Sequence, residues 1–331
     1  MIKKNELNSV YVIAEIGINH EGSVTQCAKM IDEAALIGVD AIKLQTINAD
    51  SNYVFNSKSY KIFKGSELTH SETAEMFTLA KSHGLDIFTT AGDIETINWV
   101  DKLNPSCWKV SSGLLTHTNI VRYLASLGRP LLISTGMAND EEIDFAMKTA
   151  RSEGNNDISL LQCTSLYPAP FDSINLKTIK TLKRKYKCNV GFSDHSIGID
   201  AAFLSVGAGA TIIEKHFSLD PTRPSFDHRI SLNTEQFKEM IHRIRFAEKI
   251  MGSSSKTLSK EIKETRKNFL RSIVAIKDIS KGERLTASNI GVKRTLSGRG
   301  GSEPKYFDDV LGLIATKDFK MNDPITIEEI I

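Results

Sequence analysis

The stretch "GFSDHSIGIDAAFLSVGAGATIIEKHFSLD", residues 191–220, contains one full strand–helix–strand pattern. It begins inside the apolar run "CNVGFS" (188–193), continues through a helix-like segment, and reaches a second apolar run, "ATIIEKH" (210–216). Short apolar runs that alternate with longer amphipathic segments are typical of βα units around a parallel sheet. The stretch therefore predicts two neighbouring parallel strands. A histidine stands at the end of each, 216 − 195 = 21 residues apart.

The same alternation covers roughly the first 250 residues. Eight strands are predicted, at 10–16, 41–45, 85–90, 107–111, 130–135, 158–163, 188–193 and 210–216. In the first intervening helix, Ser23 is a suitable N-cap and Gly38 a suitable C-cap. Eight parallel strands in ~250 residues predict a (β/α)₈ TIM barrel. A doubly wound open sheet is the alternative, but the even spacing and the lack of GxGxxG after the first strand favour the barrel.

The sequence changes character after residue 250. Residues 251–269 include a polar, highly charged connector, "GSSSKTLSKEIKETRK" (252–267). In the segment that follows, "AIKDISKGERLTASNI" (275–290) is similar to "ATKDFKMNDPITIEEI" (315–330) at an offset of 315 − 275 = 40. An internal repeat of this kind predicts a small, pseudo-symmetric β-rich domain. We therefore expect a barrel at 1–250, a connector at 251–269 and a second domain at 270–331.

The composition narrows the class of protein. The 331 residues carry a formal net charge of +2 without any block of Lys or Arg, so no nucleic-acid partner is expected. The four cysteines are far apart and include no CxxC pair, which argues against a zinc knuckle or a disulfide framework. No signal-peptide core is present, and no uncharged apolar run approaches the ~18 residues that a membrane span needs. We expect no membrane partner and a cytoplasmic location.

Polar residues stand where the predicted strands end. The active site of a (β/α)₈ barrel lies at the C-terminal ends of its strands, so these residues are candidates for it. They are Glu15, Lys43, Gln45, Thr90, Ser112, Ser134, Ser165, Tyr167, Ser193, His195 and His216. Side chains alternate along a strand, so Glu214 shares a face with His216, while Lys215 points the opposite way.

Two subsets of these residues, the histidine pair and Lys43 with its neighbouring hydroxyl groups, have a specific chemical interpretation. His195 and His216 end adjacent strands and can converge on one divalent ion that also takes water and substrate oxygens. Either histidine alone would more often be an ordinary hydrogen-bonded residue, but their pairing favours the metal site. Lys43, beside a ring of hydroxyl groups, predicts a cradle for a small anion. The alternative for Lys43 is an internal ion pair with a carboxylate such as Glu15.

The ordered set of motifs resembles the sialic acid synthase family, whose members condense phosphoenolpyruvate with a sugar. The similar segments are "AEIGINHEGS", "AIKLQT", "LLISTGM", "CTSLYPAPFDSINL", "GFSDHSIG" and "IIEKHFSLD", with "FDHRISL" after the last of them. The repeat-bearing C-terminal segment resembles the antifreeze-like (SAF) domain of the same family. The resemblance spans nearly the whole chain.

This resemblance implies a metal-dependent reaction of phosphoenolpyruvate with an N-acetylmannosamine-type sugar, which yields a nonulosonic acid and phosphate. It implies Mn²⁺ as the cofactor, with Mg²⁺ and Co²⁺ as alternatives, bound by His195 and His216. It places Glu15 beside the reacting carbons and, in a domain-swapped homodimer, Arg294 in the partner's active site. The implied phosphoenolpyruvate contacts are Lys43, Thr90, Ser112, Ser134 and Ser193, and the implied sugar contacts are Gln45, Tyr167 and Asp227.

Two positions depart from the sialic acid pattern. Leu114 stands where that branch has a glutamate, and Ser165 stands where it has an asparagine. The resemblance places both near the sugar, so the acceptor is left open between N-acetylmannosamine and a deoxy or diacetamido relative. Two other functions remain open: a Schiff-base aldolase on the same barrel with Lys43 as the amine, and an inactive relative that only binds a sugar.

Overall fold

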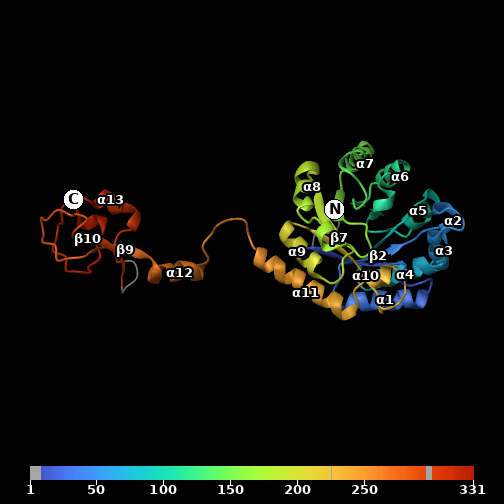
Figure 1. Ribbon diagram of the computed structural model, residues 1–331, viewed down its shortest axis with the longest axis horizontal. Coiled ribbons are helices and arrows are strands. Elements are labelled where there is room, and N and C mark those ends of the chain that lie inside the picture. Colours follow the sequence, from blue (N-terminus) through green and yellow to red (C-terminus); the bar gives the residue numbers. More distant parts are fainter. Residues whose placement is uncertain (1–8, 225, 296–299) are drawn as a thin grey trace. The chain divides into compact units, whose positions relative to one another are not determined.

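The computed structural model describes residues 9–224, 226–295 and 300–331. The chain divides into two compact units, Met1–Gly252 and Ser253–Ile331 (Figure 1). Each unit has its own hydrophobic core.

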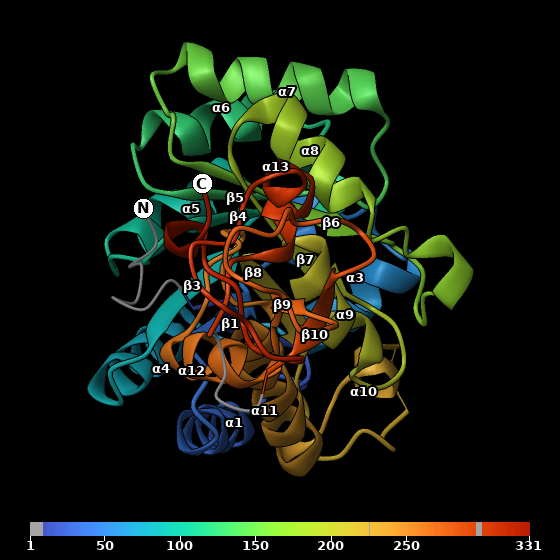
Figure 2. The same ribbon diagram turned by 90° about the vertical axis from the view of Figure 1, so that its left-hand side faces the viewer.

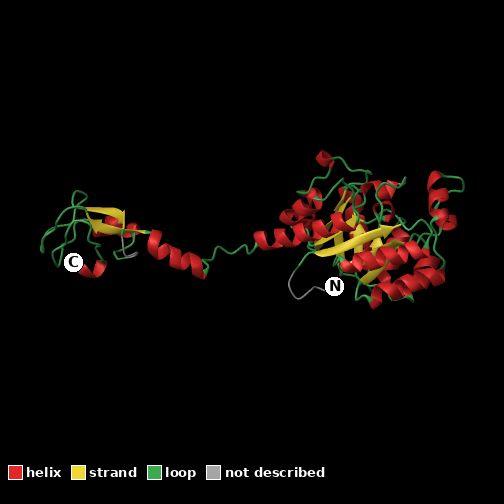
Figure 3. Cartoon of the chain, turned by 90° about the horizontal axis from the view of Figure 1, so that it is seen from below, coloured by secondary structure: helices red, strands yellow, loops and turns green. Residues whose placement is uncertain are grey.

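The first unit is a closed barrel of eight parallel strands in sequential order. Figure 3 shows the strands in yellow with helices around them. The strands are β1 (Tyr11–Gly17), β2 (Ala41–Gln45), β3 (Asp86–Thr90), β4 (Trp108–Val110), β5 (Leu131–Ser134), β6 (Ile158–Cys163), β7 (Asn189–Asp194) and β8 (Ile212–His216). β8 pairs with β1 and closes the barrel. The predicted barrel is therefore confirmed, with every strand inside or within one residue of its predicted range.

Helices surround the strands, as Figure 2 shows for α1, α4, α6, α7, α8 and α11. The long helices are α1 (Val24–Leu36), α3 (Lys58–Gly65), α4 (His70–Ser82), α5 (Ile94–Asp101), α6 (Thr118–Ser126), α7 (Asp140–Ser152), α8 (Thr178–Tyr186), α9 (Asp200–Ala208) and α11 (Thr234–Met251). Shorter pieces are α2 (Ala49–Asn52), η1 (Ser112–Leu114), η2 (Phe171–Ser173) and α10 (Phe226–Ile230). Ser23 caps α1 by accepting a hydrogen bond from the Gln26 amide, and Gly38 follows its end with a φ of +80°.

The interior of the barrel changes from apolar to polar along the strands. A buried apolar cluster fills the amino-terminal part: Tyr11, Ile13, Ala41, Phe88, Cys107, Leu132, Leu161 and Ile212. Two residues further along the same strands, alternation places inward-facing polar groups. These are Glu15, Lys43, Thr90, Lys109, Ser134, Cys163 and Glu214, and all of them are buried. The barrel is thus packed shut at one end and polar at the end where catalytic residues are expected.

The second unit contains α12 (Lys260–Phe269), the antiparallel pair β9 (Arg271–Ala275) and β10 (Ile290–Arg294), η3 (Pro304–Tyr306), α13 (Phe307–Val310) and η4 (Ile327–Glu329). Its internal repeat is visible in the backbone. Ile279 forms a bridge with Phe319, its equivalent in the second repeat (319 − 279 = 40). The Lys281 amide donates to Asp318 Oδ1 at 2.7 Å, and the equivalent Met321 amide donates to Asp278 Oδ1 at 2.9 Å. The two repeats therefore contact each other about a local pseudo-twofold axis.

Within the described residues, no helix combines the length and the apolar character that a bilayer crossing requires. The four cysteines are free: Cys27, Cys107 and Cys163 are buried, and Cys188 is half-buried.

Candidate active site

A cavity of about 260 Å³ opens at the carboxyl ends of the barrel strands. All eight strands or the loops that follow them contribute to its lining. Every predicted site residue of the barrel lines it except Asp227: Glu15, Lys43, Gln45, Thr90, Ser112, Ser134, Ser165, Tyr167, Ser193, His195 and His216. The structure therefore brings residues from sequence positions 15 to 216 into one polar cavity.

Charged side chains form a chain of ion pairs at the base of the cavity. Lys43 Nζ lies 3.0 Å from Glu15 Oε2 and 3.3 Å from Glu214 Oε2. On the other side of Glu214, its Oε1 lies 3.6 Å from Lys109 Nζ. Gln45 Nε2 donates to Glu15 Oε1 at 2.8 Å. The ion pair between Lys43 and Glu15 that the sequence left as an alternative is present, and a second lysine accompanies it.

The two carboxylates differ in protonation. Burial raises the pKa of Glu15 to about 7, with the attraction of Lys43 opposing it and the charge of Glu214 adding to it. Burial acts on Glu214 in the same direction, but Lys109, Lys43 and the Ser193 hydroxyl outweigh it and lower its pKa to about 2. Near neutral pH, Glu214 is therefore a fixed anion, and Glu15 can gain or lose a proton.

The lysines differ as well. Burial alone would favour a neutral amine at Lys43, but Glu15 and Glu214 outweigh it and raise the pKa of Lys43. At Lys109, burial dominates over the attraction of Glu214 and lowers the pKa.

Hydroxyl groups line the cavity beside the lysines. Thr90 Oγ1 and Ser134 Oγ are buried and have no hydrogen-bond partner among the described residues. Ser112 Oγ accepts a hydrogen bond from the Gly136 amide at 2.9 Å, and Ser193 Oγ donates to Glu214 Oε1 at 2.8 Å. Because an unpaired buried hydroxyl is unfavourable, the first two residues indicate a ligand with hydrogen-bonding oxygens.

The two histidines line the same cavity, with ring centroids 5.5 Å apart. His195 Nδ1 lies 2.9 Å from the Thr164 carbonyl oxygen, so Nδ1 donates a hydrogen bond and Nε2 is the ring atom left as a candidate metal ligand. The Tyr167 ring stacks on His195 at 4.2 Å and limits its rotation. His216 Nδ1 is buried and has no hydrogen-bond partner in the part of the chain that the structure describes, and burial, reinforced by His195 and Lys43, holds the pKa of His216 well below its usual value.

These two imidazoles fit a divalent ion only if other ligands come from water or substrate. Among the described residues, no group of three or more histidine, cysteine, aspartate or glutamate side chains is placed to hold a metal ion. His216 Nδ1, which has no partner among the described residues, and His195 Nε2 nevertheless provide two candidate ligand atoms in one cavity.

Three residues named from the sequence lie outside the lining. Asp227, on α10, is buried, and burial raises its pKa to about 6 while His195 and Lys43 oppose the rise. Arg294 belongs to β10 of the second unit, where its guanidinium lies 4.7 Å from the centre of the Phe269 ring. Leu114 packs against the core between strands and helices, whereas its neighbour Gly113 lines the cavity.

Lys109 and Gly136 were missed by the sequence reasoning. The signal for Lys109 was available, because alternation in "CWKVS" places it on the same face as Ser111, which also lines the cavity. Gly136 allows three side chains to converge. A Cβ there would lie 2.4 Å from Ser165 Oγ, 2.9 Å from Cys163 Sγ and 3.0 Å from Ser112 Oγ. No local pattern announces a requirement of this kind.

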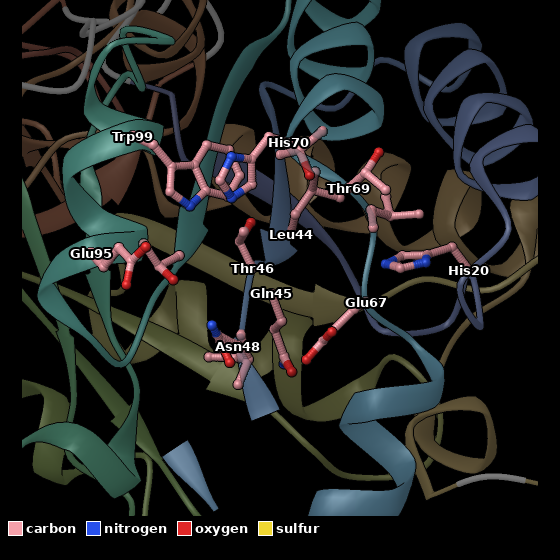
Figure 4. Close-up of a pocket in the computed structure, with 14 residues that line it drawn as sticks. His20, Leu44, Gln45, Thr46, Asn48, Glu67, Thr69, His70, Glu95 and Trp99 are labelled. Atoms are coloured by element: carbon pink, nitrogen blue, oxygen red, sulfur yellow. The ribbon is translucent and has the colours of Figure 1, made fainter. Parts of the chain in front are cut away.

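A second cavity, of about 220 Å³, lies on the other side of the segment that follows β2 and shares only Gln45 and Ile47 with the first (Figure 4). The rings of Trp99 and His70 stack at one side of it, with ring centroids 4.0 Å apart. Its lining includes Glu67 and Glu95 but no lysine or arginine among the described residues. It therefore does not suit an anionic ligand.

The chain matches the model of the NeuB family over residues 30–256 and that of the SAF domain over residues 271–331. The chain belongs to the NeuB family. Pseudaminic acid synthase of Campylobacter jejuni is 33% identical to it over 335 residues, which cover 97% of this chain and 96% of that protein. N,N'-diacetyllegionaminic acid synthase of the same species is 32% identical, with 96% and 99% covered.

A solved structure of a NeuB family relative has the same barrel. It is the N-acetylneuraminic acid (sialic acid) synthetase of Leptospira borgpetersenii in complex with citrate, with 30% identity and a TM-score of 0.75. The match covers 78% of this chain and 90% of that one. The resemblance to sialic acid synthases and to the SAF domain, first drawn from short motifs, is thereby confirmed.

Proposed function

We propose that this NeuB family protein condenses phosphoenolpyruvate with an N-acetylated amino sugar of the N-acetylmannosamine type, in a reaction that depends on a divalent metal. The products are a nonulosonic acid and inorganic phosphate. The observation that carries the proposal is one cavity lined by two buried lysines, two histidines and two hydroxyl groups that have no partner among the described residues. Relatives named as synthases of pseudaminic and N,N'-diacetyllegionaminic acid support this class of product.

The anionic substrate is assigned to the lysine side of the cavity. Lys43 and Lys109 supply positive charge, and the hydroxyls of Thr90 and Ser134 would gain the partners that they lack. The Ser112 hydroxyl accepts from an amide and is free to donate to a substrate oxygen. Ser193 can take part only if its hydroxyl leaves Glu214.

The metal is assigned to His195 and His216, with Mn²⁺ as the ion and Mg²⁺ or Co²⁺ as alternatives. Two imidazole donors leave most positions of such an ion open for water and sugar oxygens. When bound, it would act as a Lewis acid on the aldehyde oxygen of the open-chain sugar.

The reaction needs no covalent enzyme intermediate. The methylene carbon of phosphoenolpyruvate forms a bond with the aldehyde carbon of the sugar, and the aldehyde oxygen becomes a hydroxyl by taking up a proton. Water adds to the carbon that carries the phosphate ester and gives up one proton. The C–O bond to phosphate then breaks, and the proton of the added hydroxyl passes to the leaving phosphate, which leaves a 2-keto acid. Glu15 ionises near neutral pH and is placed to hold or release one of these protons.

The sugar is assigned to the outer part of the cavity. Gln45, Ser165 and Tyr167 line the cavity with hydrogen-bonding groups, and the buried Asp227 is close enough for His195 and Lys43 to oppose the rise of its pKa. Apolar side chains also line the cavity: Ile47, Phe63 and Met137, together with the ring of Tyr53. Such a lining suits methyl and acetamido groups, so it supports a deoxy or diacetamido sugar alongside N-acetylmannosamine as acceptor.

Arg294 is assigned to the active site of a partner subunit in a domain-swapped homodimer. Its side chain is exposed on the second unit, and no arginine is found among the described residues that line the barrel cavity. An arginine that arrives from outside would add a charge-assisted contact to the bound substrates and help to exclude water.

The Schiff-base aldolase is less well supported. A lysine that attacks a carbonyl must be neutral, but the raised pKa of Lys43 keeps it protonated. Lys109, whose pKa is lowered, would be the better amine. If a Schiff base forms on either lysine, borohydride reduction with a 2-keto acid present would attach the acid to it covalently. We expect no such adduct on Lys43 or Lys109.

The proposed function is tested by measuring phosphate release from phosphoenolpyruvate with a panel of N-acetylated hexosamines, including deoxy and diacetamido members, in the presence of Mn²⁺. We expect release to depend on both a sugar and the metal. No release with any member of the panel would contradict the proposal and favour a relative that only binds sugars.

A further inference from the structure

A buried ion pair joins the ends of β7 and β8 on the outer face of the barrel, opposite the cavity. Lys215 Nζ lies 2.9 Å from Asp194 Oδ2, and both side chains are fully buried. The same ammonium donates to the Ser196 carbonyl oxygen at 2.5 Å. Asp194 Oδ1 in turn accepts from the amide and the hydroxyl of Ser196, at 2.8 and 2.7 Å.

These contacts involve the chain neighbours of both candidate metal ligands. His195 stands between Asp194 and Ser196, the two residues to which Lys215 is bound, and His216 follows Lys215 directly. Asp194 and Lys215 are also register partners in the β7–β8 pair. Movement of either strand end would therefore break at least two charge-assisted hydrogen bonds.

Stability alone does not account for this pair. Removing two ions from water is costly, and a well-packed apolar pair of similar volume is often as stable or more stable. Both side chains are fully buried, so this cost applies to both ions. The geometric order that the pair imposes on the strand ends is the remaining contribution.

We infer that Asp194 and Lys215 are positioning residues, which hold His195 and His216 at the separation needed to bind one divalent ion. The inference rests on the proposed function, because it assigns a ligand to the two histidines. It concerns the placement of the ligands and not their chemistry. Loss of the pair should therefore weaken metal binding even where the barrel remains folded.

The test uses the full chain, freed of metal by a chelator, and titrates it with Mn²⁺ while the free ion is followed by electron paramagnetic resonance. The Asp194→Asn/Lys215→Met double variant removes both charges at nearly constant volume. We expect its dissociation constant for Mn²⁺ to rise about tenfold or more, while the KM for phosphoenolpyruvate changes little. The matched control is Asp101→Asn/Arg129→Met, which removes a 2.6 Å ion pair away from the cavity and should leave Mn²⁺ binding unchanged.

Each other outcome has a definite meaning. Equal Mn²⁺ affinity in the double variant and the wild type overturns the inference and leaves the proposed function intact. A wild-type chain that binds no Mn²⁺ overturns the inference together with the assignment of Mn²⁺ to the two histidines, whereas the phosphate-release assay decides the proposed function separately. A double variant that fails to fold shows that the pair serves stability, which also contradicts the inference. Ser196→Ala, which removes one hydroxyl contact and keeps both charges, should weaken Mn²⁺ binding about two- to threefold.

Discussion

Glu15→Gln is expected to stabilise the barrel at neutral pH, although it removes a carboxylate that contacts a lysine. Burial raises the pKa of Glu15 from its usual 4.5 to about 7. Between these values the folded state keeps a proton that the unfolded state has lost, so the stability of the wild type falls as pH rises through this window. The rise of this pKa from 4.5 to about 7 means that ionised Glu15 lowers the free energy of unfolding by about 3 kcal/mol. This loss of stability is complete above pH 7.

Glutamine has nearly the same shape and does not titrate. The free energy of unfolding of Glu15→Gln should therefore equal that of the wild type near pH 4.5 and exceed it by up to about 3 kcal/mol at pH 7.5. Phosphate release should fall strongly in the same variant, because its side chain cannot hold a proton for the reaction.

Glu214→Gln is the matched control and should behave in the opposite way. The lysines and Ser193 lower the pKa of Glu214, so its carboxylate contributes stability above about pH 4.5 that is lost as pH falls further. Glu214→Gln should lower the free energy of unfolding at pH 7.5 by an amount similar to the gain in Glu15→Gln. This difference from the wild type should shrink as the pH falls below about 4.5.

Urea unfolding followed by tryptophan fluorescence measures these effects between pH 3 and 8. Both tryptophans, Trp99 and Trp108, lie in the barrel unit, so the signal reports that unit alone. If Glu15→Gln and Glu214→Gln shift stability in the same direction at pH 7.5, the opposite protonation states assigned to the two carboxylates are refuted.

Further predictions follow from the same cavity. Excess chelator should abolish phosphate release and Mn²⁺ should restore it, whereas His195→Ala and His216→Ala should stay inactive with unchanged circular dichroism; full activity in chelator would contradict the metal site. Lys109→Met should raise the KM for phosphoenolpyruvate about tenfold or more and spare that for the sugar, and equal rises in both would argue against the assignment. Mixed dimers of Arg294→Ala and His195→Ala should regain up to about half of the activity per dimer, and no recovery despite subunit exchange would exclude the swap. Leu114→Glu should destabilise the barrel without changing acceptor preference, because Leu114 packs against the core; an altered preference would return it to the sugar site.

The sequence by itself determined the barrel and most of its candidate site. A local apolar run marks each barrel strand, and the candidate residues of the barrel cavity follow from their places on or just after such a run, whereas Asp227 and Arg294 came only from the family resemblance. Alternation along a strand is equally local, so it correctly placed Lys43 and Gln45 in the cavity and turned Lys215 away from it. The repeat at an offset of 40 likewise predicted the pseudo-symmetric second unit, in which Ile279 and Phe319 pair.

Only the tertiary structure decided how these residues act on one another. The contact of Lys109, on β4, with Glu214, on β8, depends on how the barrel closes and on the register of its strands. The two residues are 214 − 109 = 105 positions apart, and no local pattern encodes that register. The opposite protonation of Glu15 and Glu214 depends on burial and on distances to two lysines, which exist only after the barrel has closed. The packing of Leu114 against the core, away from the cavity, has the same origin, since side-chain direction in the short turn after β4 is set by the neighbouring elements. Patterns along the chain specify which face a residue occupies, but the electrostatic energy of a site depends on distances across the chain.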